Sequence, residues 1–234
     1  SAVIDTIDSA TQVTLTVNST SSGTNTVTFK VPATQMYDVF VFDSGGSPKL
    51  QMVAWTSDTV RATALTTQNG RYVKTGATTH LYLGSFRSNA AGSTDSSDIY
   101  RGLWNYFNRV LRRCMVNDTT SHTYNSTVVR SWNNSTANRF EVVCGVVEDA
   151  INLSINGRVD ANGAVSFIAI GQNSTTVQIE TGNMGGSDAA AAQIAAVPVV
   201  IYPTLGYSYY QALERAHAGV ATFSNYRAYG FYPA

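Results

Sequence analysis

Two pairs of carboxylates are the residues of this chain best suited by type and spacing to do chemistry. Asp95 and Asp98 lie in a Ser/Thr-rich stretch, and Glu148 and Asp149 are neighbours. Glycosidases use two carboxyl groups that face each other roughly 5–9.5 Å apart across a cleft. Neighbours in an extended chain point to opposite faces, and aspartates in Ser/Thr loops commonly cap turns. We therefore interpret these carboxylates as structural, with polysaccharide cleavage as the least favoured alternative.

Nucleophilic and metal chemistry have no recognisable pattern in this chain. The histidines His80, His122 and His217 stand apart, and no GxSxG, HExxH, GxGxxG or phosphate-binding loop motif occurs. We interpret His80 as an outward-facing strand residue and the other two as loop or turn residues. The sequence predicts no catalytic, cofactor-binding or metal-binding residue, and a protein that is not an enzyme.

The two cysteines, Cys114 and Cys144, lie far apart in the sequence. A disulfide between them would close a loop of about 30 residues and stabilise the fold by about 3.5 kcal/mol. Cys144 lies in an apolar run, however, where a reduced cysteine packs as a small hydrophobic side chain. We favour two free thiols, and the disulfide stays open as the alternative.

Trp132 is the aromatic residue with the strongest indication of a ligand. It precedes Asn133 and Asn134 at the expected end of a strand. An exposed ring can stack on a sugar face while amides bind its hydroxyls, so these three residues are predicted as a glycan contact. Packing in the protein core is the competing interpretation, and it is the one we favour for Trp55 and Trp104.

A second aromatic group lies near the C-terminus, in residues 206–214. Strand alternation places Tyr207 and Tyr209 on one face and Tyr210 with Glu214 on the other. Both faces then carry a ring, as in a strand that its own core covers on one side and a partner subunit on the other. Tyr207, Tyr209 and Tyr210 are predicted subunit-interface residues.

The composition describes a polar protein with little charge. Charged residues make up 13% of the 234 residues, about half of the roughly 25% usual in soluble domains. Fifteen basic and fifteen acidic residues cancel, so we expect no nucleic-acid partner. Residues 109–113 are locally basic, and we favour a strand end or a subunit-interface ion pair there over a phosphate contact.

No apolar run approaches the roughly 18 residues of a membrane span, and residues 1–5 lack the features of a signal peptide.

Period-two alternation of apolar and polar residues recurs along the chain, as in residues 13–17 and 151–155. It indicates antiparallel strands with one solvated face. Turn signals separate these segments, at residues 18–23, 43–48, 69–70, 156–157 and 162–163. The regular spacing of short strands predicts an all-β protein, an antiparallel β-sandwich. Residues 187–196 fit a short capped helix or a crossing loop equally well, and residues 57–65 fit a helical turn.

A change in character near residues 70–76 suggests two parts. Simple hairpins with Thr-rich faces precede it, and long loops and most tyrosines follow it. We predict a small N-terminal β-module at residues 1–75 and a larger C-terminal sandwich at residues 76–234. One continuous sandwich is the alternative.

Several segments resemble structural proteins of tailed-bacteriophage virions. The sequence YLGSFR at residues 82–87 and LWNYFNRV at residues 103–110 is similar to the central signature "YLGTF…WNYYNRV" of that family. Residues 37–42, 54–61 and 70–76 resemble its opening module, and residues 205–214 resemble its penultimate aromatic strand. The chain departs from the pattern at residues 95–98, at Cys114 and at its last five residues.

The resemblance implies a jelly-roll-like β-sandwich on the virion exterior. It implies a capsid decoration, head fiber or tail component that assembles as a homo-oligomer, with a trimer as the expected state, and that contacts other virion proteins. It carries over no catalytic residue. A receptor-binding module for host surface glycan is the alternative function, and a polysaccharide depolymerase is the third.

Overall fold

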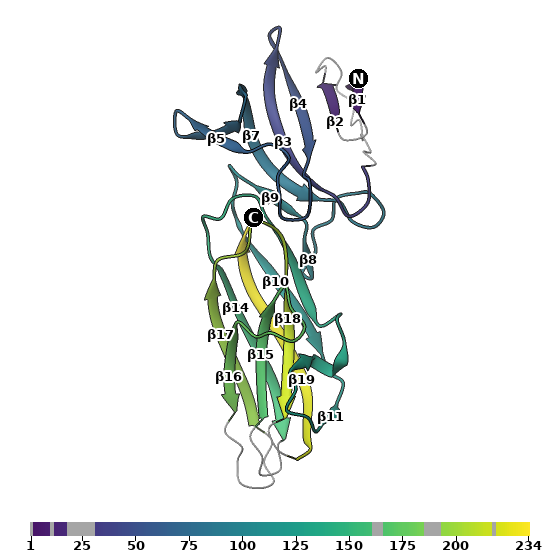
Figure 1. Ribbon diagram of the computed structural model, residues 1–234, viewed down its shortest axis with the longest axis vertical. Coiled ribbons are helices and arrows are strands. Elements are labelled where there is room, and N and C mark those ends of the chain that lie inside the picture. The colour runs from purple at the N-terminus through teal and green to yellow at the C-terminus, as the bar shows by residue number, and fades with distance from the viewer. Residues whose placement is uncertain (1, 10–11, 18–30, 161–165, 185–192, 217–218) are drawn as a thin grey trace.

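The computed structural model describes residues 2–9, 12–17, 31–160, 166–184, 193–216 and 219–234. In these residues the regular structure is nearly all β-strand, and the exception is the 3-10 turn η1 (Trp132–Asn134). Figure 1 shows strands of the N-terminal half above a second body of long strands that run along the long axis. Within the described part, no helix is long and apolar enough to cross a membrane.

The N-terminal strands form one antiparallel sheet. Its order is β1-β2-β4-β3-β7-β6-β5, and β9 pairs with β7 on a branch. The strands are β1 (Ala2–Ser9), β2 (Gln12–Val17), β3 (Met36–Ser44), β4 (Ser47–Ala54), β5 (Leu65–Gln68), β6 (Arg71–Lys74), β7 (Ala77–Arg87) and β9 (Leu103–Asn105). We call it the first sheet.

Turn chemistry explains the hairpins of the first sheet. Asn69 and Gly70 connect β5 to β6 with φ angles of 51° and 73°, and Gly45 and Gly46 connect β3 to β4 with φ angles of 63° and 84°. Two successive positive φ angles give the two-residue turn whose twist matches that of paired strands. Asparagine and glycine adopt these angles at low cost, which is why the sequence predicted both turns.

The strands after Asn105, together with β8, form two further sheets. One contains β10 (Leu111–Asp118), β19 (Ala221–Pro233), β14 (Ile151–Asp160) and β17 (Gln193–Ile201), with β11 (His122–Tyr124) paired to β19. The other contains β16 (Glu180–Met184), β15 (Ser166–Gln172), β18 (Gly206–Ala216), β13 (Arg139–Cys144) and β8 (Tyr100–Arg101), with β12 (Arg130–Ser131) paired to β18. All pairs are antiparallel except that of β8 with β13.

The pairing order of these two sheets is that of a jelly roll. Among the eight long strands β10 and β13 to β19, the first pairs with the last, the second with the seventh, the third with the sixth and the fourth with the fifth. Such nested pairs arise when one long antiparallel ribbon rolls up into two packed sheets. The predicted all-β, jelly-roll-like sandwich is therefore confirmed.

The predicted division at residues 75 and 76 stays a prediction. The first sheet continues across that position, because β3 pairs with β7 and β7 pairs with β9. The long strands of the jelly roll begin only at Leu111.

Two local predictions are wrong. Residues 193–196 of the suggested helix belong to β17, and residues 185–192 lie outside the described residues. Residues 57–64 form no helical turn, with bends at residues 57–59 and 62–63, and Leu65 begins β5.

The predicted turn at residues 156–157 is also wrong. Gly157 lies inside β14, opposite Ala195 of β17, and the register with β19 slips beside it. A Cβ atom at Gly157 would lie 2.9 Å from the indole of Trp132. Glycine stands here because a ring from another strand connection packs directly on the backbone.

The close contact at Gly157 makes a testable prediction. Gly157→Val should lower the free energy of unfolding by about 1–3 kcal/mol, because the added side chain must displace a buried indole. Urea unfolding measures this change. The matched control Asn156→Val places the same side chain on the neighbouring residue, which is half-buried, and should change stability by less than about 0.5 kcal/mol. Equal losses at both positions would contradict the packing explanation.

Candidate functional site

A buried guanidinium connects the first sheet to the jelly roll. Arg61 Nε donates to Asp38 Oδ2 at 2.8 Å, and an Nη donates to the Tyr82 hydroxyl at 3.2 Å and to the carbonyl oxygen of Gly145. The guanidinium carbon lies 4.5 Å from the ring centre of Trp55 and 5.5 Å from that of Tyr82. Gly145 belongs to the jelly roll and the other partners to the first sheet or its loops, so one cation bridges both parts.

The carboxylate that binds Arg61 is itself held by hydroxyls. Ser85 Oγ donates to Asp38 Oδ1 at 2.6 Å, and the Tyr82 hydroxyl lies 2.6 Å from Ser85 Oγ. Asp38, Ser85 and Tyr82 are almost completely buried. Burial of charge is costly unless each group is paired, and here both carboxylate oxygens of Asp38 have a hydrogen-bond partner.

A second ion pair holds the same boundary a short distance away. Arg87 donates from two nitrogens to Asp58, at 2.9 and 3.0 Å, and its guanidinium carbon lies 4.1 Å from the ring centre of Tyr207. The backbone N–H of Tyr207 donates to the carbonyl oxygen of Asp58 at 2.9 Å. Gly206 has a φ of 87°, and a Cβ atom there would lie 2.1 Å from that same carbonyl oxygen. The loop of Asp58 therefore packs directly on the start of β18.

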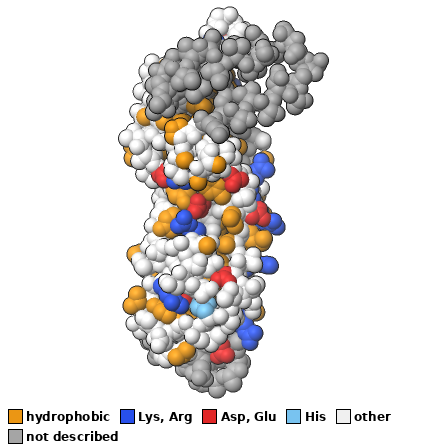
Figure 2. All heavy atoms as spheres, turned by 90° about the vertical axis from the view of Figure 1, so that its right-hand side faces the viewer, with side chains coloured by type: hydrophobic (Ala, Val, Ile, Leu, Met, Phe, Trp, Pro, Cys, Tyr) orange, Lys and Arg blue, Asp and Glu red, His pale blue; other side chains and the backbone are white. Residues whose placement is uncertain are grey.

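An apolar cleft lies beside the Arg61 contacts. It has a volume of about 420 Å³ and lies between the first sheet and the loops of the jelly roll. Its lining residues are Arg61, Ala64, Leu65, Tyr72, Val146, Val147 and Leu205. The volume falls in the range of small-ligand sites. Figure 2 shows a different face of the molecule, on which hydrophobic side chains lie beside acidic and basic ones across the middle.

Three of the four carboxylates singled out from the sequence bind arginines. Arg109 contacts Glu148 at 2.8 Å and Asp149 at 2.5 Å, and the Tyr72 hydroxyl donates to Glu148 at 3.1 Å. Asp98 pairs with Arg101 and Arg113, whereas Asp95 is exposed and takes no part in that cluster. Asp98, Glu148 and Asp149 thus anchor their loops through arginines.

The structure corrects the glycan prediction at Trp132. The indole is fully buried among His122, Phe223, Tyr226 and Gly157. It has no exposed face on which a sugar could stack, because the 3-10 turn directs it into the space between the two sheets.

The amides that follow Trp132 stay near the surface. Asn133 and Asn134 have positive φ angles of 54° and 50°, and Asn133 Nδ2 donates to Asp118 Oδ2 at 3.2 Å. Asn134 is exposed. A glycan contact at these two residues stays a prediction, without the ring that motivated it.

The tyrosines of β18 alternate as predicted, but the chain covers more of them than expected. Tyr210 is 1% exposed and stacks on Phe140 with 5.4 Å between ring centres, so it is a core residue instead of an interface residue. Tyr207 and Tyr209 lie on the opposite face and are half-buried, the latter beneath the guanidinium of Arg139 at 4.6 Å. A subunit interface at Tyr207 and Tyr209 stays a prediction.

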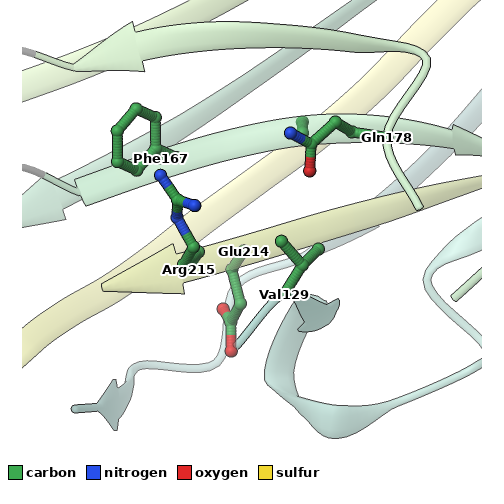
Figure 3. A pocket seen from close by; sticks show the side chains of 6 residues that line it. Val129, Phe167, Gln178, Glu214 and Arg215 are labelled. Carbon is green, nitrogen blue, oxygen red and sulfur yellow. The ribbon is translucent and has the colours of Figure 1, made fainter. Parts of the chain in front are cut away.

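A buried charge cluster that the sequence did not reveal surrounds Glu214. Its side chain is fully buried, and it contacts His122 Nε2 at 2.5 Å and Arg130 at 2.7 Å. Figure 3 shows Glu214 and Arg215 on opposite sides of β18, with Arg215 beside Phe167. The cavity next to them measures about 10 Å³, which is room for a single water molecule and none for a substrate. The cluster joins strands of both sheets, so we interpret it as structural.

Of the remaining residues with reactive side chains, the two cysteines are buried and His80 is half-buried. Cys114 and Cys144 are free thiols in the jelly-roll core, and burial raises the pKa of each to about 11. His80 is half-buried, with its ring stacked on Phe42, and His217 lies outside the described residues. In the described ranges no group of three or more His, Cys, Asp or Glu side chains is placed to hold a metal ion.

The fold and these contacts define a two-part all-β protein whose C-terminal part is a jelly roll. No protein-family model and no curated protein matches the chain. Among solved structures, it is similar to the insecticidal delta-endotoxin Cry8Ea1 of Bacillus thuringiensis, with 8% identity, a TM-score of 0.34, and coverage of 100% of this chain and 52% of that one. The chain thus spans about half the length of that toxin.

A second similar structure is that of infectious bursal disease virus, Gx strain. The identity is 8%, the TM-score is 0.36, and the match covers 96% of this chain and 70% of that one. Both likenesses concern the general β architecture, and no functional statement follows from them.

The Arg61 contacts make a prediction about stability. Arg61→Leu should lower the free energy of unfolding by about 3–5 kcal/mol, because it leaves the Asp38 carboxylate buried without a cation. Urea unfolding measures the loss, and Asp38→Asn in the same chain should recover part of it. Arg71→Leu is the control at an exposed position and should cost less than about 0.5 kcal/mol. A loss no larger than that of the control would show that the ion pair does not hold the boundary.

The raised pKa values predict that the two thiols do not react with thiol reagents in the native protein. At pH 8 a thiol with a pKa of about 11 is almost entirely protonated, and the thiolate is the reactive form. We expect Ellman's reagent to leave the native chain unlabelled and to label both cysteines in denaturant, where their pKa returns to about 8.5. Rapid labelling of the native chain would contradict the burial of the thiols.

Proposed function

We propose that this chain is a structural protein of a bacteriophage virion, located on the particle exterior as a capsid decoration, head fiber or tail component. It acts as a homo-oligomer, with a trimer as the expected state, and contacts other virion proteins. Three features support the proposal: the family resemblance of the sequence, the jelly-roll fold, and one exposed sheet face. Jelly rolls serve in viral capsids and in lectins, so the fold by itself leaves the function open.

The observation that carries the proposal is the exposed face of the sheet β10-β19-β14-β17, which we call the outer sheet face. Val200 lies opposite Asn152, Asn152 opposite Phe231, and Phe231 opposite Arg113, so these four side chains form one row across the sheet. The large apolar side chains of this face are Leu111 (66% exposed), Ile194 (80%), Val200 (69%), Tyr229 (39%) and Phe231 (47%).

This amount of exposed apolar surface is large for a lone chain. The five side chains expose on the order of 500 Å² together, which is near the upper end of the largest patch on a typical monomer. A second copy that covers the outer sheet face would remove this area from water. Tyrosine, phenylalanine and arginine, which occur together here, are typical of interface centres.

The edge of the same sheet indicates that copies meet face to face. Strand β17 is the last strand in the order of this sheet, and Pro198 lies at its middle, opposite Ser154. Proline has no backbone N–H, so it blocks the addition of a further strand at this edge.

The role proposed here is not catalytic. Glu148, Asp149 and Asp98 are engaged by arginines, and Glu214 is sealed in the core. These partners support a structural role for the carboxylates.

The proposal predicts self-association through the outer sheet face. Light scattering at micromolar concentration should report an oligomer. Val200→Asp combined with Phe231→Asp should shift the chain to a monomer with an unchanged circular dichroism spectrum, because two buried charges oppose the contact. Phe107→Asp is the matched control, since Phe107 is 53% exposed and lies outside this face.

Two results would contradict the proposal. One is a wild-type chain that is monomeric at micromolar concentration. The other is a cryo-EM map of the intact particle in which no exterior density fits this jelly roll.

A further inference from the structure

Arg112 occupies an unusual position in the jelly roll. It lies on the same side of β10 as Cys114, which is fully buried, and opposite Tyr232, which is 1% exposed. Its neighbour Arg113 points the other way and binds Asp98. In the described part of the chain no carboxylate pairs with Arg112. The Arg112 side chain is exposed at this end of β10, so its charge is open to a ligand from solvent.

Arg112 lines a cleft at the open end of the sandwich. The cleft has a volume of about 310 Å³ and lies between β9 of the first sheet and the start of β10. Ser96, Leu103, Asn105, Asn108 and Ala234 also line it, together with Arg101. It is distinct from the apolar cleft beside Arg61, because the two share no lining residue.

The polar groups that face this cleft are mainly donors. Asn105 Oδ1 accepts from the backbone N–H groups of Phe107 and Asn108, at 3.1 and 3.2 Å, so its amide nitrogen is left to donate. Arg101 is already bound to Asp98, Ser96 and a backbone carbonyl oxygen. Arg112 and the amides of Asn105 and Asn108 therefore remain for a ligand. No aspartate or glutamate lines the cleft.

The lining thus combines Arg112, two amides and the apolar side chain of Leu103, beside Arg101, which is already paired with Asp98. Arginine binds carboxylate and phosphate groups with two parallel hydrogen bonds. Amides bind hydroxyl groups, and Leu103, which is 48% exposed, offers a surface for the C–H face of a ring. A cleft of this volume accommodates a small ligand and excludes a helix or a strand.

We propose that this cleft binds an acidic sugar, a saccharide that carries a carboxylate or a phosphate group. Arg112 pairs with the anionic group, and Asn105 and Asn108 donate to the hydroxyls. Leu103 packs against the ring. The site does not depend on the proposed assembly role, since no residue of it belongs to the apolar side chains of the outer sheet face.

The test adds small-molecule probes to the full chain and measures their binding by calorimetry and by ligand-detected NMR. The probes are trigalacturonic acid, glucose 1-phosphate, the neutral maltotriose and inorganic phosphate. We expect at least one of the two anionic saccharides to bind, more weakly as salt is raised, and maltotriose not to bind. Which anionic saccharide binds distinguishes a carboxylate from a phosphate ligand.

Variants assign the binding to the cleft. Arg112→Gln should weaken binding of the anionic saccharide at least tenfold, and Asn108→Ala should weaken it severalfold. Arg71→Gln, the same change at an exposed arginine of β6, should leave it unchanged. Thermal unfolding of each variant checks that the fold is intact.

Three results would overturn the proposal. Neither anionic saccharide binds; inorganic phosphate binds as tightly as the saccharides; or Arg112→Gln leaves saccharide binding intact and instead dissociates the oligomer. The last result would assign Arg112 to an ion pair between copies. Because oligomer state and saccharide binding are read separately, failure of this site is distinguishable from failure of the assembly proposal.

Discussion

The burial of the Arg61 guanidinium is the constraint on which the rest of the structure depends. A cation this deep needs a carboxylate, further acceptors and ring faces, and they come from both parts of the chain: Asp38 and Trp55 from the first sheet, and the carbonyl oxygen of Gly145 from the jelly roll. Gly145 must be a glycine, because a Cβ atom there would lie 2.3 Å from Trp104 and from the Tyr82 hydroxyl. Removal of one partner of a buried ion pair is strongly destabilising, so we infer that this contact holds the two parts in one orientation.

A fixed orientation of the two parts is what the proposed role in an assembly requires. The jelly roll closes its own core by nested strand pairing, and the first sheet is held against its end by ion pairs and stacked rings. Among the described residues, those of the outer sheet face form a large exposed apolar surface. The apolar side chains of this face and the residues that line the Arg112 cleft are different, so the two proposals rest on different residues.

Structural features with a local cause could be predicted from the sequence, whereas contacts between residues far apart in the sequence could not. The turn at Asn69 and Gly70 follows from the φ angles that these residues tolerate, and the alternation in β14 follows from its two faces. The glycan prediction at Trp132 and the turn prediction at Gly157 were wrong for the same reason. The two residues contact each other, and they come from segments that are far apart in the sequence. Glu214 was placed on the correct face of its strand, but its partners come from β11 and β12, whose positions depend on the jelly-roll pairing order. The pairing order cannot be predicted from any single segment, because all of these strands have the same period-two alternation of apolar and polar residues.

The central claim is that the buried contacts around Arg61 make the first sheet and the jelly roll one rigid body. It is tested most directly by a pulsed electron-spin distance measurement between labels on Thr67→Cys in the first sheet and Asn225→Cys in the jelly roll, because the native thiols are buried. Our account predicts a single narrow distance distribution in the otherwise wild-type chain and a broad one when Arg61→Leu is added. A broad distribution with Arg61 present, or a narrow one without it, would contradict the account.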